Sequence, residues 1–301
     1  MYSADYEKRF SSHVRLMAGV KASESRPENA LELVNMYNGE WQYANGISNN
    51  MKMKESIQAA YSSVELDYNK TKFNVGLRYE HTNTQVGYDV AGKPGLDRRF
   101  GNLFPSVFVR RELSDASSIQ LAYSRRIARP PFAAIAPSVT FNDIYSIYLG
   151  NPMLRPAITD NIQTTFQYKQ YLFSLTYSKD KNQFIEHQHI ESPSDSSFQI
   201  VTQNLKYQQS VILQSSFPLT ITSWWKTYNS ISLGWKEIVT AYTAAPNFTK
   251  NYPVINIWMG QYFTLPAGFA AELTAFFYST DYSGAYKRRG FGSLGAGLKK
   301  T

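Results

Sequence analysis

Side-chain polarity alternates at every second residue through much of this chain. In the segment KFNVGLRYE, residues 72–80, the apolar positions are Phe73, Val75, Leu77 and Tyr79. Successive side chains of a β-strand point to opposite faces, so this segment is predicted to be a strand with one apolar and one polar face. The pattern recurs around Leu121, Leu175, Leu233 and Ile257, whereas segments with a helical period are nearly absent. The sequence therefore predicts an all-β protein.

The connections between these segments alternate between short and long. The short ones, which contain turn residues, are 68–71, 113–117, 169–172, 217–224 and 265–268. The long ones are 25–52, 88–102, 129–157, 188–197, 242–252 and 282–290. Tight turns at one end of the strands and long loops at the other are typical of an antiparallel transmembrane β-barrel of the outer membrane. We expect about twelve strands, each of about ten residues or more, which is long enough to cross a bilayer at a tilt.

Composition excludes several other classes. No apolar run approaches the roughly 18 residues of a membrane-spanning helix. The absence of cysteine excludes disulfides and thiolate metal sites. The net charge of +8 comes without a basic helical face, so we expect no nucleic-acid partner. The 22 Tyr and 18 Phe, against 18% charged residues, suit a surface that meets both water and an apolar phase.

Two motifs resemble those of a known family. The stretch GNPMLRPAITDNIQTTFQY, from Gly150, resembles the GNP-x-L-x-P-E-x-S strand entry of TonB-dependent outer-membrane receptors. The preceding LFPSVFVRRELSDASSIQLAYSRRIARPPF, from Leu103, is similar to the pair of strands that comes before it in that family. Ala157 stands where the family usually has Glu, and Arg111 where an aromatic residue is usual. The resemblance implies the barrel portion of a receptor for ligand capture and energised uptake.

The resemblance also implies parts that this sequence does not contain. Receptors of this family have a larger barrel of about 22 strands, an N-terminal plug inside it and a segment that binds a TonB-type energy-transducing complex. We therefore expect residues 1–301 to be a single β-barrel domain, a fragment without the plug and the closing strands. The expected location is the outer membrane of a Gram-negative bacterium. Such a fragment alone is not expected to close a barrel, because its edge strands lack partners.

The 129–157 connection is the candidate ligand-binding loop. It combines aromatic side chains with flanking cations, namely Arg129, Phe132, Phe141, Tyr145, Tyr148 and Arg155. Aromatic surface beside positive charge suits a nutrient ligand that is partly apolar or sugar-like. The alternative is that these aromatic residues pack among themselves or form the aromatic girdle at the membrane surface.

Alternation also assigns charged residues to the wall of the lumen. These are Arg78, Glu80, Arg110, Glu112, Arg126, Asp180, Lys236 and Glu272. The four cations balance the four carboxylates, which argues against a strongly charge-selective pore. In a receptor such a wall would hold the plug, and the alternative is that it only hydrates the lumen. Residues of the opposite face should meet lipid: Leu77, Tyr79, Leu121, Tyr123, Leu175, Leu233 and Ile257.

No enzyme motif such as G-x-S-x-G or H-E-x-x-H occurs, and we expect no catalytic residues and no cofactor. GFGSLGAG, from Gly290, lacks the strand and helix of a nucleotide site. His187 and His189 are too few for a closed metal site, so no metal is expected. A passive porin is the main alternative to a receptor, ahead of a barrel enzyme.

Basic residues gather at the ends of the strands that carry long loops. They form the groups Arg98–Arg99, Arg125–Arg126 with Arg129, and 287–289. Phosphate groups of outer-membrane lipid and glycolipid are one counter-charge at that height, and an anionic ligand is the other.

Overall fold

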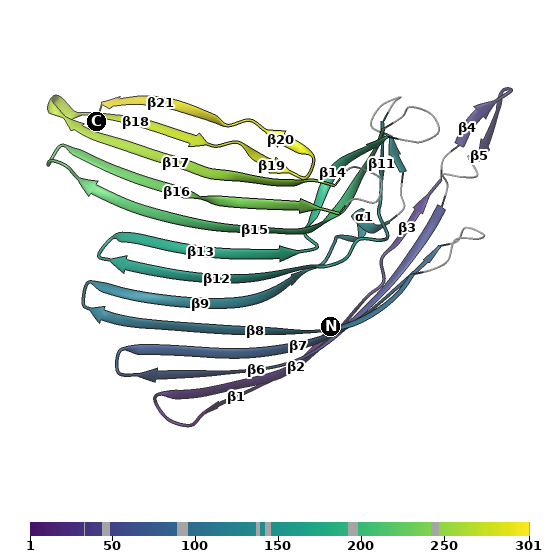
Figure 1. Ribbon diagram of the computed structural model, residues 1–301, viewed down its shortest axis with the longest axis horizontal. Helices are drawn as coiled ribbons and strands as arrows, with labels where there is room; N and C mark the ends of the chain where they lie inside the picture. The colour runs from purple at the N-terminus through teal and green to yellow at the C-terminus, as the bar shows by residue number, and fades with distance from the viewer. Residues whose placement is uncertain are drawn as a thin grey trace.

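The computed structural model describes residues 1–32, 34–43, 49–88, 96–136, 139–141, 146–191, 198–241 and 247–300. It consists almost entirely of one curved antiparallel sheet (Figure 1). Within the described residues, no helix is long and apolar enough to span a membrane. The all-β prediction is therefore confirmed.

Thirteen strands form a meander in which each described strand pairs with the next. They are β1 (Tyr2–Arg9), β2 (Val14–Ser25), β6 (Asn49–Tyr68), β7 (Thr71–Tyr88), β8 (Leu96–Ser114), β9 (Ser117–Ala128), β12 (Ala157–Tyr168), β13 (Tyr171–Lys181), β15 (Phe198–Thr220), β16 (Trp225–Thr240), β17 (Thr249–Leu265), β18 (Phe269–Tyr278) and β21 (Phe291–Lys300). The expectation of about twelve strands agrees with this meander. Among the described pairings, β1 pairs only with β2 and β21 only with β18.

Shorter elements lie between the long strands. These are β3 (Glu28–Leu31), β4 (Val34–Tyr37), β5 (Glu40–Tyr43), β10 (Val139–Phe141), β11 (Ser146–Leu149), β14 (Phe184–Glu191), β19 (Asp281–Ser283), β20 (Tyr286–Arg288), the one-turn helix α1 (Phe132–Ile135) and a 3₁₀ turn, η1 (Pro266–Gly268). Except for η1, they all belong to the long connections. Alternation alone does not reveal most of them, because apart from β14 each has four residues or fewer.

The two kinds of connection are at opposite ends of the sheet (Figure 1). We call these the turn end and the loop end. At the turn end, Asn69, Lys70 and Lys169 adopt positive φ angles, which tight hairpins require. Two connections are shorter than predicted. β15 continues through Thr220, with Pro218 still in register with Tyr228, and β8 already begins at Leu96.

The register gives the sheet two chemically different faces, because cross-strand partners point to the same side. One row across six strands reads Leu121, Thr164, Leu175, Leu213, Leu233 and Ile255. We call this side the apolar face and the other the polar face. All seven residues that were expected to meet lipid lie on the apolar face.

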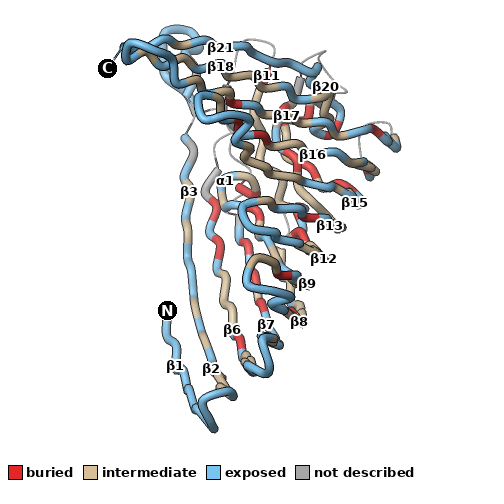
Figure 2. The backbone as a smooth tube through the Cα atoms, turned by 90° about the vertical axis from the view of Figure 1, so that its left-hand side faces the viewer, coloured by how far each residue is buried: buried red, intermediate tan, exposed pale blue. Residues whose placement is uncertain are grey.

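The polar face is the concave side of the sheet. Ile135 of α1 packs against Met51 and Met53 of β6 and Val86 of β7, whose side chains share the polar-face parity of Glu80. Figure 2 shows α1 inside the curve of the sheet. The apolar face is therefore convex, as expected for the lipid side of a barrel wall.

Candidate functional site

All eight charged residues that alternation assigned to one wall lie on the polar face. Arg126 and Asp180, for example, are both cross-strand partners of Thr159. Asp180 in turn pairs with Gln208, which pairs with Ile238, two residues from Lys236. Arg110 and Glu112 line a hollow at the turn end of this same face, at the opposite end of the strands from the loops. The polar face therefore carries both signs of charge along its length.

Glu80 is the centre of a network that fixes the start of the 129–157 connection. Its side chain is only 8% exposed. Arg78 donates to one carboxylate oxygen at 2.6 Å, and Arg129 donates to the other at 2.7 Å. Arg129 also donates to the hydroxyl of Thr82 at 3.0 Å. Because two guanidinium groups share one carboxylate, the chain leaving β9 is drawn onto the polar face of β7.

A small apolar core continues this attachment. Ile135, Ala136 and Leu154 of the connection are buried against Met51, Met53 and Val86, and Phe132 packs at the edge of the group. Burial of this kind stabilises by roughly 25 cal/mol per Å² of apolar surface. The described residues 129–136 and 150–155 of this connection are therefore folded inward over the loop end of the polar face.

The GNPMLRP stretch ties three strands together. Asn151 donates its side-chain amide to the Thr202 carbonyl at 2.9 Å. Asn204 of β15 accepts from the Arg155 backbone N–H at 2.8 Å and donates to the Arg155 carbonyl at 3.0 Å. Arg98 of β8 donates to the carbonyls of Pro152 and Leu154. The motif serves as a brace between β8, β12 and β15.

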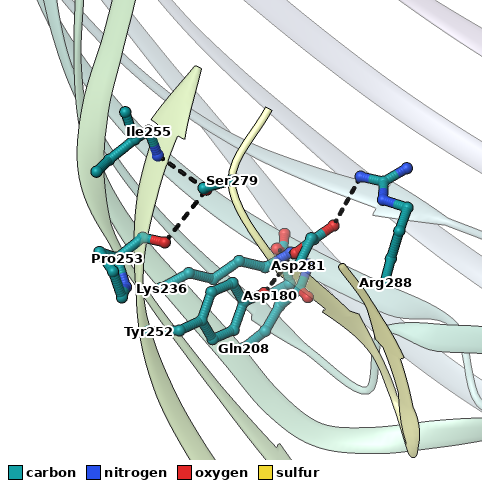
Figure 3. Close-up of polar contacts among 9 residues, drawn as sticks. All are labelled: Asp180, Gln208, Lys236, Tyr252, Pro253, Ile255, Ser279, Asp281 and Arg288. Carbon is teal, nitrogen blue, oxygen red and sulfur yellow. Dashed lines mark hydrogen bonds and ion pairs between the residues drawn. The ribbon is translucent and has the colours of Figure 1, made fainter. Parts of the chain in front are cut away.

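A second cluster of polar contacts lies at the loop end, around the β19–β20 hairpin (Figure 3). Asp281 accepts a hydrogen bond from the Tyr252 hydroxyl at 2.7 Å. Its carboxylate is also 3.7 Å from the Lys236 ammonium and 3.4 Å from the Arg288 guanidinium. Lys236 and Tyr252 belong to the polar face, so these contacts hold the hairpin against that face.

A hollow of about 490 Å³ lies beside this hairpin. Its lining includes Gln183, Glu186, Gln208, Lys236 and Asp281. Gln208 is also hydrogen-bonded to Asp180 at 2.8 Å. The lining offers donors, acceptors and both charges, and such a site can bind a small polar molecule at the loop end.

The predicted ligand-binding residues do not form one group. Arg129 and Phe132 are engaged with the sheet, as described above. Tyr148 lies in β11, half-buried beside β15, and Arg155 is exposed. The side chain of Phe141, and Tyr145 altogether, are outside the described residues, as are the side chains of His187 and His189. Among the described residues, no three potential metal ligands come together.

Sequence reasoning did not single out several residues that organise the loop end. Asp281 and Tyr252 belong to this group, as do Asn151 and Asn204. The only signal for Asn151 is its place in the GNP motif, since Asn is frequent where a side chain must bond to backbone groups. Asp281 follows the end of a strand, where alternation gives no information.

A meander of long strands with a convex apolar face, a concave polar face and its long connections at one end defines the wall of an outer-membrane β-barrel. The model of the outer membrane protein beta-barrel family matches residues 1–301. The chain belongs to this family, and its location is the outer membrane of a Gram-negative bacterium. No curated protein sequence matches the chain.

Solved structures with a similar fold include transporters and an uptake receptor. The copper transporter OprC has a TM-score of 0.64 at 14% identity, over 98% of this chain and 47% of that one. The FrpB iron transporter from Neisseria meningitidis has a TM-score of 0.60 at 12% identity, over 99% and 48%. The ferric yersiniabactin uptake receptor FyuA from Yersinia pestis has a TM-score of 0.59 at 10% identity, over 98% and 45%. The chain thus shares their fold and spans about half of their length.

Proposed function

We propose that this chain forms part of the wall of a TonB-dependent receptor that captures a nutrient ligand at the loop end and takes it up through a plugged lumen. The observation that carries the proposal is the inward folding of the loop-end elements. Arg129 and Asp281 attach two separate connections to the polar face. In this arrangement the long connections build a structured entrance over the lumen.

The charge of the polar face supports a receptor over a selective pore. Its assigned wall residues carry four cations and four carboxylates, and rings of one sign are what give pores selectivity. A balanced wall suits hydrogen bonds and ion pairs to a plug. The plug and the segment that contacts a TonB-type complex would belong to the region that precedes this barrel portion in the full-length receptor.

Ligand choice belongs to the loop end in this proposal. Tyr148 supplies aromatic surface at the loop end, where the polar hollow around Lys236 also lies. The names of the solved structures that share the fold give copper, iron and ferric yersiniabactin as what those proteins transport or take up. Metal chelates are therefore the first ligands to test.

Electrical recording from the full-length protein in a planar lipid bilayer tests the proposal without knowledge of the ligand. A receptor whose plug fills the lumen should show no steady open-pore current in the native state. Denaturant that unfolds the plug before the barrel should open the pore. A steady current that rises linearly with voltage in the native protein would identify a passive porin instead.

A further inference from the structure

The sheet is split at the loop end between β8 and β9. Their pairing runs from the turn end as far as Ser106 and Ser124, and the described part of β8 beyond it, residues 96–105, pairs with β7 alone. Pro105 lies at the point of separation and has no backbone N–H with which to extend a ladder. β9 continues with β12 up to the pair of Ala128 and Ala157. A notch therefore opens between β8 and the β9–β12 pair.

The notch has a volume of about 440 Å³. Asp97 and Arg99 of β8 line one side, and Ile127, Arg155 and Ile158 line the other. Arg99 shares the apolar-face parity of Leu103. Ile127 and Ile158 are direct partners on that same face, so the notch is open on the convex surface of the sheet. Arg98, Phe100 and Asn102, which have polar-face parity, line it as well.

The rows of residues below the notch fix its height relative to the membrane. On β9, β12 and β13, the apolar row of Leu121, Thr164 and Leu175 is followed by Tyr123, Ile162 and Tyr177. The next rows are Arg125, Asp160 and Lys179, and then Ile127, Ile158 and Lys181. Each row is about 7 Å further along the strands. The change from apolar to aromatic to charged side chains marks the membrane surface, so the notch lies at the height of the lipid headgroups.

Charge distinguishes the notch from the balanced polar face. Arg98, Arg99 and Arg155 line it, against the single carboxylate of Asp97. Asp97 is 3.3 Å from Arg99, and both side chains are more than half exposed. Arg155 is exposed and takes part in no ion pair among the described residues. The notch therefore has an excess of cations.

We propose that this notch binds the phosphorylated headgroup of an outer-leaflet glycolipid. The guanidinium groups of Arg99 and Arg155 match phosphate oxygens in geometry and charge. The acyl chains would lie along the apolar face below, near Leu103 and Leu121. The edge of β8 that lacks a strand partner here would gain polar groups to bond with, which an edge at a membrane surface requires. The site is on the outside of the wall and is separate from the transport route.

The test measures the glycolipid retained by the full-length protein after purification in detergent and exchange into glycolipid-free micelles. The wild type should retain a phosphorylated glycolipid. The double variant Arg99→Gln/Arg155→Gln should retain at least about tenfold less, because each basic residue at a membrane surface contributes to binding. The double variant Arg99→Lys/Arg155→Lys should retain most of it. The control Lys70→Gln/Lys72→Gln, which removes two exposed cations at the turn end, should behave as the wild type does.

Add-back experiments separate a glycolipid from a free anion. Purified lipid A should rebind to the delipidated wild type, whereas lipid A without its phosphates should not. Equal retention by wild type and the Gln double variant, with both folded by heat-modifiable migration, would overturn the proposal. Saturable binding of inorganic phosphate with no binding of lipid A would overturn it as well, and would assign the notch to a free anion.

Discussion

The close approach of Gly150 to Ala136 is the tightest contact in the brace at the loop end. A Cβ atom at Gly150 would lie 1.5 Å from the carbonyl oxygen of Ala136. The carbonyl oxygen belongs to the backbone, and the backbone fixes the position of a Cβ, so neither atom can rotate away. Glycine is therefore required where the GNP motif passes α1.

We predict that Gly150→Ala loosens the 129–157 connection from the polar face. Overpacking of this kind typically costs about 1–3 kcal/mol. Amide hydrogen exchange should be faster at Ala136 and Asn151 in the full-length variant. Gly87→Ala is the control, because a Cβ there meets no atom within 4 Å and should leave these rates unchanged. Unchanged rates in Gly150→Ala would show that the brace does not depend on this contact.

Individual residues differ in how much of their role the sequence reveals. Alternation placed Arg78 and Glu80 on one face, because the face of a strand residue depends only on its parity. The hydrogen bond from Arg129 to Glu80 was not predictable, because Arg129 lies 49 residues further along the sequence and reaches Glu80 only through the path of its loop. Phe132 was predicted as a ligand contact and packs against the apolar core at the loop end. Its role in ligand binding stays a prediction.

At the scale of one strand, β16 gives the clearest contrast between the two faces. Leu233 pairs with Leu213 and Ile255 on the apolar face, whereas Ser232 pairs with Gln214 and Asn256 on the polar face. Leu233→Arg should destabilise the folded full-length barrel by about 2–4 kcal/mol, the usual cost of a cation at mid-bilayer. Ser232→Arg should change stability little. Urea titration in lipid vesicles measures both, and similar losses would contradict the assignment of the faces.

The β19–β20 hairpin depends on a few polar contacts. Asp281 bonds to Tyr252 and lies near Lys236 and Arg288. Asp281→Ala should lower the local opening free energy of the hairpin by about 1–3 kcal/mol, because partly buried donors lose their acceptor. Hydrogen exchange of the hairpin amides in the full-length protein should speed up accordingly. Asp67→Ala, an exposed change at the turn end, is the control. A hairpin protected equally in all three proteins would show that other contacts hold it.

Most of the long strands were predictable as elements because they repeat a period of two over ten residues or more, whereas β1 has only eight residues. The expected alternation of short and long connections is present as well. The short strands β10 and β11 were not predictable, since β10 pairs with β11 and β11 forms only where the loop meets β15. β11, for instance, pairs in parallel with β15, which is 49 or more residues away in sequence. Local periodicity carries no information about such a pairing.

At the scale of the whole molecule, neighbouring strands in the sequence are neighbours in the sheet. This simple order is why the family and the fold could be recognised from motifs and alternation. The split between β8 and β9 was not foreseen, although Pro105 stands within the quoted FPS motif. A proline marks where a ladder can stop, but only the paths of the neighbouring strands show that it does stop.

The central claim is that one continuous convex face meets lipid and one continuous concave face meets water. The chain contains no cysteine, so a thiol reagent that reacts with this region can react only with the single cysteine introduced into it. In outer membranes treated with denaturant that unfolds the proposed plug but leaves the barrel folded, a water-soluble maleimide should label the full-length protein with Gly76→Cys, Gln120→Cys or Ser232→Cys. It should leave Leu77→Cys, Leu121→Cys, Leu175→Cys and Leu233→Cys unlabelled, because these positions face lipid. Equal labelling of the two sets, or labelling of the leucine positions alone, would contradict the account.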